Sequence, residues 1–204
     1  MRAVICLLAL ATLVAGCTSS TGGSAQPQPG GDGPAPTTRA ASPSSANDNY
    51  GAPKVTTPMD TVKWQPNPCT TVTPAQLQAL GITQPGKLTT DPKGNFCEWS
   101  SQLDVSYTFA FNTGFQPGDA KGLANIYEFA TPGSMRRLPD IDGQVAVTQQ
   151  SQNTNGSCTI YLGATDAVSY AVDVEVEAGQ PHYNDPCTPA QQVAQAATAT
   201  MKAG

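Results

Sequence analysis

The sequence predicts an α+β domain in which an antiparallel sheet of four to five strands is packed against about three helices and stapled by two disulfides. Apolar and polar residues alternate over residues 103–111 and again over residues 168–176, which is the period of a strand with one buried face. Helix-like and strand-like segments do not alternate regularly, and this excludes a β-α-β fold. Four cysteines after residue 60 supply the disulfides.

The first 16 residues have the composition of an export signal. Arg2 provides a positive charge, residues 3–13 are apolar, and residues 14–17 read Val-Ala-Gly-Cys. An apolar run of about 7–15 residues is typical of a signal peptide, whereas a membrane-spanning helix needs about 20. The ending is similar to a bacterial lipobox, so we expect residues 1–16 to be a lipoprotein signal peptide and Cys17 to be lipidated. An ordinary secretory signal is the alternative.

Residues 17–61 are predicted to be the lipidated cysteine followed by a disordered tether. Between residues 18 and 58, 25 of 41 residues are Pro, Gly, Ser or Thr, and such a composition buries too little apolar surface to offset the entropy of folding. A flexible coil of this length reaches about 35–40 Å. The remaining residues, 62–204, are enough for a single domain with one core.

The first half of this domain begins with a predicted helix over residues 74–80. Thr73 is its expected N-cap, with proline at its first position and glycine after its end. Strands are predicted over residues 96–99 and 103–111, then a glycine-rich loop over 112–118. A second helix is expected over residues 119–129, with Phe129 facing the core.

The second half of the domain is predicted to hold three more strands and a final helix. The strands cover residues 144–149, 157–162 and 168–176, of which the last has the clearest alternation. Thr188 is the expected N-cap of a helix that runs to about residue 202 and presents Val193, Ala197 and Met201 to the core.

Cys69, Cys97, Cys158 and Cys187 are expected to form two disulfides, because an exported chain folds in an oxidising compartment. Cys69 and Cys187 precede predicted helices, whereas Cys97 and Cys158 lie in strand-like runs. The nearest helix-to-strand pairs are Cys69–Cys97 and Cys158–Cys187, and the crossed pairings stay open because spacing does not determine connectivity. Zinc-ligand spacing is absent from the sequence, so no metal and no cofactor is expected.

The charge of the chain argues against nucleic acid as a partner. Loss of Arg2 with residues 1–16 changes the net charge from −5 to −6, and no basic stripe is present that neutralises phosphates. The membrane contact is therefore expected to be made by covalent lipid rather than by charge.

No catalytic residue is assigned from the sequence. The motifs Gly-x-Ser-x-Gly, Ser-x-x-Lys and His-Glu-x-x-His are absent. The one histidine, His182, lies in a predicted surface turn. Asp140 and Asp142 resemble the start of a calcium loop without its other ligands, and the carboxylates within residues 173–177 share the polar face of a strand.

Phe115 is the candidate binding residue. It lies beside a glycine in the predicted loop 112–118, where a large apolar side chain has little local structure to support it. It either folds back into the core or belongs to a binding loop, since functional contacts concentrate on loops.

Three motifs carry a resemblance to a known family. They are Asn-Pro-Cys followed by Thr-Pro and Ala-Leu-Gly over residues 67–81, Cys97-x-Trp99, and Asp185-Pro186-Cys187 before the final helix. Together they resemble the actinobacterial, mycobacterial-type cell-envelope lipoproteins of unknown function, over residues 64–204. Asn67 stands where that family more often has aspartate. The resemblance implies an envelope lipoprotein with disulfides inside its domain, and it implies no activity.

The expected function is a membrane-anchored envelope lipoprotein, on the outer face of the plasma membrane, that acts as a non-catalytic module binding an unknown protein, glycan or lipid. One alternative is a carrier of a hydrophobic ligand, which requires an apolar cavity of several hundred cubic ångströms between sheet and helices. The other is a wall-active hydrolase, which requires a cleft that brings acidic residues to His182.

Overall fold

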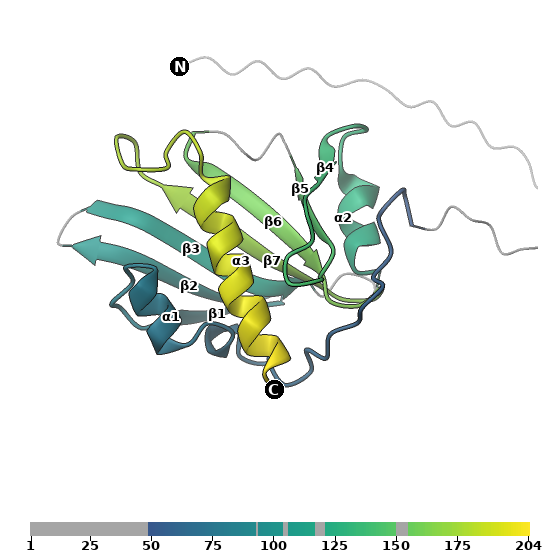
Figure 1. The fold of residues 1–204 in the computed structure, drawn as a ribbon, viewed down its shortest axis with the longest axis horizontal. Helices are drawn as coiled ribbons and strands as arrows, with labels where there is room; N and C mark the ends of the chain where they lie inside the picture. Colours follow the sequence, from purple (N-terminus) through teal and green to yellow (C-terminus); the bar gives the residue numbers. More distant parts are fainter. Residues whose placement is uncertain (1–48, 93, 104–105, 117–120, 150–154) are drawn as a thin grey trace, which may run out of the picture. The chain divides into compact units, whose positions relative to one another are not determined.

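The computed structural model describes residues 49–92, 94–103, 106–116, 121–149 and 155–204. Its strands are β1 (Lys87–Asp91), β2 (Gly94–Leu103), β3 (Ser106–Gln116), β4 (Met135–Arg137), β5 (Ala146–Gln149), β6 (Ser157–Gly163) and β7 (Ser169–Val176). Its helices are the short 3₁₀ helix η1 (Pro68–Thr70) and the α-helices α1 (Pro74–Ala79), α2 (Leu123–Phe129) and α3 (Cys187–Lys202). The predicted α+β class is confirmed (Figure 1).

The strands form one antiparallel sheet in the order β1-β2-β3-β7-β6-β5-β4. Seven strands exceed the four to five that the sequence predicts. The two strands that the prediction missed, β1 and β4, are the edges of the sheet. All five residues of β1 are exposed and β4 has only three residues, so neither shows the alternation that marks a strand with one buried face.

Strand β3 extends through most of the predicted loop 112–118. Residues 113–116 pair with β7, with Phe115 opposite Tyr170. Gly114 lies under the Phe96 ring, because a Cβ there would be 2.3 Å from the Cδ1 atom of Phe96. This glycine therefore allows close packing within the sheet rather than a loop. Residues 117–118 lie outside the described residues.

The predicted helices differ from the observed ones mainly at their ends. Thr73 caps α1 as expected, in a capping box with Gln76. Helix α2 is described from Leu123, which is buried, but Phe129 is 81% exposed and does not face the core as predicted. Helix α3 begins at Cys187 with Pro186 as its N-cap, so Thr188 is inside the helix, and its hydroxyl donates to the Asp185 carboxylate.

One face of the sheet carries the main core. Helix α3 lies across this face with α1 beside it (Figure 1), and the Gln76 side chain joins the two helices by donating to the Ala196 carbonyl at 2.9 Å. Trp99 and Phe111 stack there with ring centroids 4.8 Å apart. The predicted inward residues of α3 are buried. The fully buried residues where the helix meets the sheet are Ile160, Val172 and Val174 of the strands and Ala190, Val193, Ala194 and Ala197 of α3.

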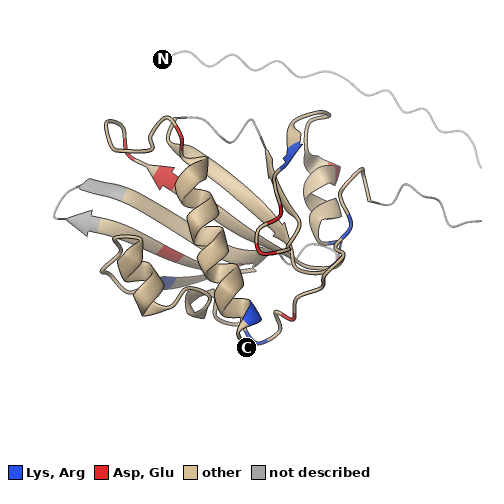
Figure 2. Cartoon of the chain, in the orientation of Figure 1, with Lys and Arg blue, Asp and Glu red and all other residues tan. Residues whose placement is uncertain are grey.

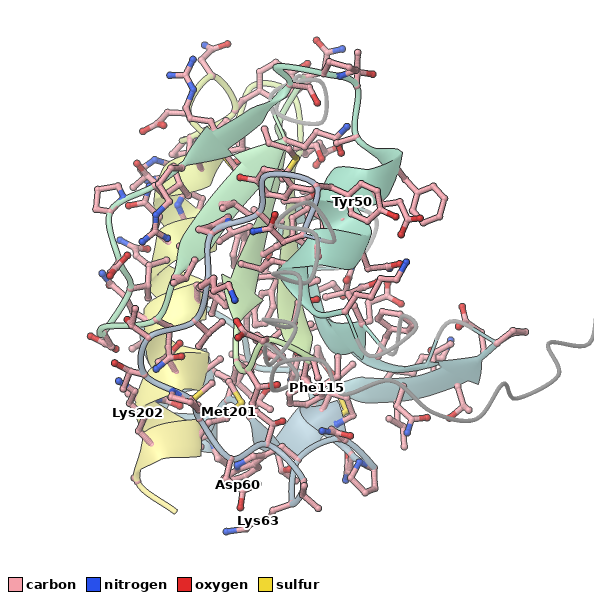
Figure 3. All side chains as sticks on the ribbon, turned by 90° about the vertical axis from the view of Figure 1, so that its right-hand side faces the viewer. Tyr50, Asp60, Lys63, Phe115, Met201 and Lys202 are labelled. Carbon is pink, nitrogen blue, oxygen red and sulfur yellow. A yellow bond between two sulfur atoms is a disulfide. The ribbon has the colours of Figure 1, made fainter. Side chains whose placement is uncertain are left out.

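Among the described residues, α2 covers the opposite face of the sheet near β5 and β6. Leu123 of α2 packs there with Val145, Val147 and Ala52 in a second, smaller cluster, so the sheet lies between α3 and α2, as Figure 3 shows. The helices thus lie on both faces of the sheet and not on a single face.

Residues 49–64 pack along the domain and connect the two clusters. Ala52 belongs to the smaller cluster, whereas Met59 and Trp64 belong to the main core. The Met59 amide donates to the Ala164 carbonyl at 2.8 Å. The predicted boundary between tether and domain at residue 62 therefore falls inside a packed segment, because a few apolar side chains in a Pro/Thr-rich stretch are enough to dock it. Residues 1–48, with the predicted signal peptide and Cys17, lie outside the described residues.

Two disulfides join helices to strands. Cys69 of η1 is bonded to Cys97 of β2, and Cys158 of β6 is bonded to Cys187 at the start of α3. These are the two pairs that the helix-to-strand argument favoured. Each bridge anchors one helix to the main core, since Cys97 and Cys158 are fully buried.

Candidate functional site

A cleft lies where residues 57–64 pass the end of α3, and we call it the C-terminal cleft. Its volume is about 380 Å³, which is in the range of small-ligand sites. Figure 3 shows Asp60, Lys63, Met201 and Lys202 gathered at this end of the domain. The lining residues are Thr57, Pro58, Met59, Asp60, Lys63, Trp64, Gln144, Met201, Lys202 and Gly204.

The wall of the C-terminal cleft contains an unpaired amide. Gln144 is 0% exposed, and neither its Nε2 nor its Oε1 atom has a hydrogen-bond partner among the described residues. Its backbone N–H and carbonyl are both bonded to Ile141, at 2.9 and 3.0 Å. A buried amide without partners costs about 1–3 kcal/mol of stability unless a water or a ligand bonds it.

The mouth of the C-terminal cleft carries two lysines. Lys63 Nζ donates to a Gly204 oxygen at 2.6 Å and lies 4.5 Å from the centre of the Trp64 ring. Lys202 Nζ donates to the backbone carbonyl of Asp142. Within the described ranges, neither ammonium group forms an ion pair with an Asp or Glu side chain. Asp60 lines the same cleft, so its mouth carries two lysines and one aspartate.

The uncovered part of the sheet forms a second, open groove of about 560 Å³. Acidic residues lie on its strands, and Figure 2 shows them on β2 and β7. Asp173 accepts hydrogen bonds from Thr159 at 2.8 Å and from Asn112 at 3.2 Å. This carboxylate thus links three strands on the polar face of the sheet.

The residues that the sequence singled out are not brought together. His182 lies in an exposed turn with a φ of 68°. It lines a pocket of about 280 Å³ with Leu80, Phe109 and Val176. None of the described residues lining this pocket is acidic, so the arrangement required for the hydrolase hypothesis is not found there.

Phe115 is a core residue, which is the first of the two alternatives that the sequence left open, and it does not belong to a binding loop. Its side chain is 5% exposed, and its ring centroid lies 4.9 Å from that of Tyr170. The glycine-rich sequence around Phe115 indicated a loop. The segment instead pairs with β7, and the Phe115 side chain packs in the main core.

A small charged cluster lies beside α2. The Glu128 carboxylate accepts from the Lys121 ammonium at 2.7 Å and from the Tyr50 hydroxyl at 2.8 Å. These contacts, first that of Lys121 and then that of Tyr50, lower the pKa of Glu128, and the Glu128 contact raises the pKa of Tyr50. The stabilising effect of Glu128 is therefore present above its ordinary pKa and lost as the pH falls.

Tyr170 should make the fold sensitive to alkaline pH. Burial raises the pKa of its phenol, which is also hydrogen-bonded to Thr71 at 2.7 Å. A group whose pKa is raised by folding stabilises the protein below its unfolded pKa, about 10, and this contribution is lost as the pH rises. We expect the free energy of unfolding to fall less steeply above about pH 10 in Tyr170→Phe than in the wild type. Urea titrations across this range measure the slopes, and equal slopes would contradict the expectation.

Helix α3 packs closely on the sheet through buried residues. Helix α3 presents small side chains to the strands, and Ala190, Ala194 and Ala197 are all 0% exposed. Such side chains let a helix approach a sheet closely. The internal cavity that the carrier hypothesis requires has no support from this packing.

Among the described residues, no group of three or more potential metal ligands is found. In the same part of the chain, no helix has the length and apolar character needed to cross a membrane.

Sequence reasoning missed Gln144 and the two lysines of the C-terminal cleft. Gln144 precedes the apolar residues Val145 and Ala146, and a polar residue at the start of a strand is ordinarily exposed. No local signal indicated that Gln144 is buried, and the other residues of its cleft, such as Met59 and Met201, are distant in the sequence.

Comparison with known proteins identifies one family. A family model described as a protein of unknown function (DUF3558) matches residues 12–200. No curated protein and no solved structure shows a significant match.

Proposed function

We propose that this chain, which belongs to the DUF3558 family of proteins of unknown function, is a non-catalytic binding module of an actinobacterial cell envelope. A lipid on Cys17 anchors it to the outer face of the plasma membrane. The observation that carries the binding function is the C-terminal cleft, where the buried Gln144 amide has no partner within the described residues. The amide is fully buried, so a ligand bonds it only if a neighbouring side chain moves aside, and such a ligand would recover the cost of burying the amide.

Two further observations support export and anchoring. The family match includes Cys17 and the residues before it from residue 12. The two disulfides of the domain are typical of proteins that fold outside the cytoplasm. A domain on a tether that reaches about 35–40 Å gains local concentration near envelope partners without any need for turnover.

Cys17→Ala should release the protein from the membrane fraction. Without the thiol no lipid is attached, and the anchor is lost. Fractionation followed by immunoblotting measures the distribution. Cys6→Ala is the matched control, because Cys6 leaves with the signal peptide and its loss should not change anchoring. Membrane retention of the Cys17→Ala chain, or an unmodified Cys17 in mass spectra of the wild type, would contradict the proposal.

Binding without turnover is tested on the lipidated full chain in detergent. The chain is incubated with an enzymatic digest of bacterial cell wall, re-isolated and analysed by native mass spectrometry. We expect a small molecule to be retained unaltered, with lower occupancy in Lys63→Ala than in the wild type. Lys87→Ala, an exposed lysine on β1, is the matched control and should retain full occupancy. Chemical conversion of the digest, or equal retention by both variants, would refute this function for the C-terminal cleft.

A further inference from the structure

We infer that the C-terminal cleft binds a carboxylate-terminated amide, which is the chemistry of the C-terminal end of a short peptide or of an N-acyl amino acid. This inference rests on the proposed function and adds the ligand class. Three features of the cleft carry it: the unpaired Gln144 amide, the two lysines at the mouth and the apolar side walls.

The Gln144 amide selects for a partner that both accepts and donates. Its Nε2 group has two donors and its Oε1 atom accepts, side by side in one plane. Both ends are unpaired within the described part of the chain, and the backbone of Gln144 is already used by Ile141. In an extended peptide the N–H and the carbonyl of one residue point to the same side, so together they can satisfy both ends of the side chain. A simple anion or an alkyl chain would leave at least one end unpaired.

The lysines select for a negative end on the ligand. The Lys63 and Lys202 ammonium groups are held by oxygens of Gly204 and Asp142, not by side-chain carboxylates of the described residues. Asp60 also lies at the mouth, and its Oδ1 atom accepts from the Val62 amide at 3.0 Å. A carboxylate on the ligand would pair with ammonium donors by charge-assisted hydrogen bonds.

The side walls limit the rest of the ligand. Met59, Trp64 and Met201 are buried and line the cleft. Thioether and indole groups favour small apolar side chains and adapt to their shape. A volume of about 380 Å³ suits one or two small residues, so the alanyl-alanine unit is a fitting probe.

The test is isothermal titration calorimetry on the lipidated full chain in detergent, with N-acetyl-alanyl-alanine as the probe. Two matched probes each lack one feature: its C-terminal carboxamide lacks the charge, and propionate lacks the amide. We expect the intact probe to bind the wild type at least about tenfold more tightly than either matched probe, a difference of about 1.4 kcal/mol.

Variants then assign the site. Gln144→Met keeps the approximate volume and removes the unpaired amide, so it should weaken binding at least tenfold while leaving the melting temperature unchanged or raised. Lys202→Met should weaken binding of the acid but not of the carboxamide. Lys87→Met, on the exposed strand β1, should change neither. Replacement of a residue that is needed only for folding would lower the melting temperature. Weaker binding by Gln144→Met with an unchanged or raised melting temperature would therefore assign Gln144 to ligand binding rather than to folding.

Each other outcome overturns the inference. If the acid and the carboxamide bind the wild type equally, the ligand class is wrong, and this comparison needs no variant to fold. If Gln144→Met binds the acid as the wild type does, an internal water satisfies the amide and the cleft is not the site. If a wall-derived molecule without carboxylate or amide is retained in a Lys63-dependent manner, the inference fails and the proposed function stands. If neither probe nor digest yields a ligand, both fail.

Discussion

Replacing Phe115 with alanine should lower the free energy of unfolding by about 3–5 kcal/mol. The side chain is 5% exposed and packs against Tyr170, its partner across β3 and β7. Its removal takes away the apolar surface of a large ring and the aromatic contact, and it leaves a cavity that the paired strands cannot close. Urea denaturation followed by tryptophan fluorescence measures the loss.

Phe129→Ala is the matched control for this substitution. Phe129 is 81% exposed at the end of α2, so the same change of residue type should alter the free energy of unfolding by no more than about 0.5 kcal/mol. A small effect of Phe115→Ala, similar to that of the control, would contradict the core position of Phe115. It would restore the hypothesis that the segment around Phe115 is a binding loop.

Loss of the Cys158–Cys187 bridge should lower the free energy of unfolding by about 3–4 kcal/mol. The bridge joins residues 29 apart in the sequence, and without it the unfolded chain gains the entropy of an open loop. The bridge also attaches the first residue of α3, the helix that covers the main core, to strand β6. The double variant Cys158→Ala/Cys187→Ala, compared with the wild type by urea denaturation, measures this contribution.

The Cys17→Ala chain is the control for the disulfide experiment, because it loses a cysteine but keeps both bridges. Its denaturation midpoint should equal that of the wild type and should fall when a reductant is added. The reductant should have a smaller effect on the double variant, which retains only the Cys69–Cys97 bridge. Equal midpoints for the wild type and the double variant would show that the bridge does not stabilise the domain.

The sequence was sufficient to predict those structural features that depend on residues close together in the chain. Thr73, Pro74 and Gln76 form a helix start whose capping contacts lie within four residues, and the capping box is present. The alternation over residues 168–176 predicts β7, a central strand with one face in the core. Edge strand β1 was missed because it is exposed on both faces, and it is held in the sheet by hydrogen bonding to β2.

The sequence by itself determined the α+β class and the acidic net charge, which argues against nucleic acid as a partner. It favoured the disulfide pairs Cys69–Cys97 and Cys158–Cys187 without excluding the crossed pairings. The tertiary structure decided the positions of Phe115 and Gln144, and the docking of residues 49–61. Phe115 became a core residue through its pairing with Tyr170. Gln144 is a buried amide in a cleft that it shares with Met59 and Met201, which are more than 50 residues away on either side. Periodicity and capping report on contacts within a few residues, whereas burial depends on segments that meet only when the chain folds.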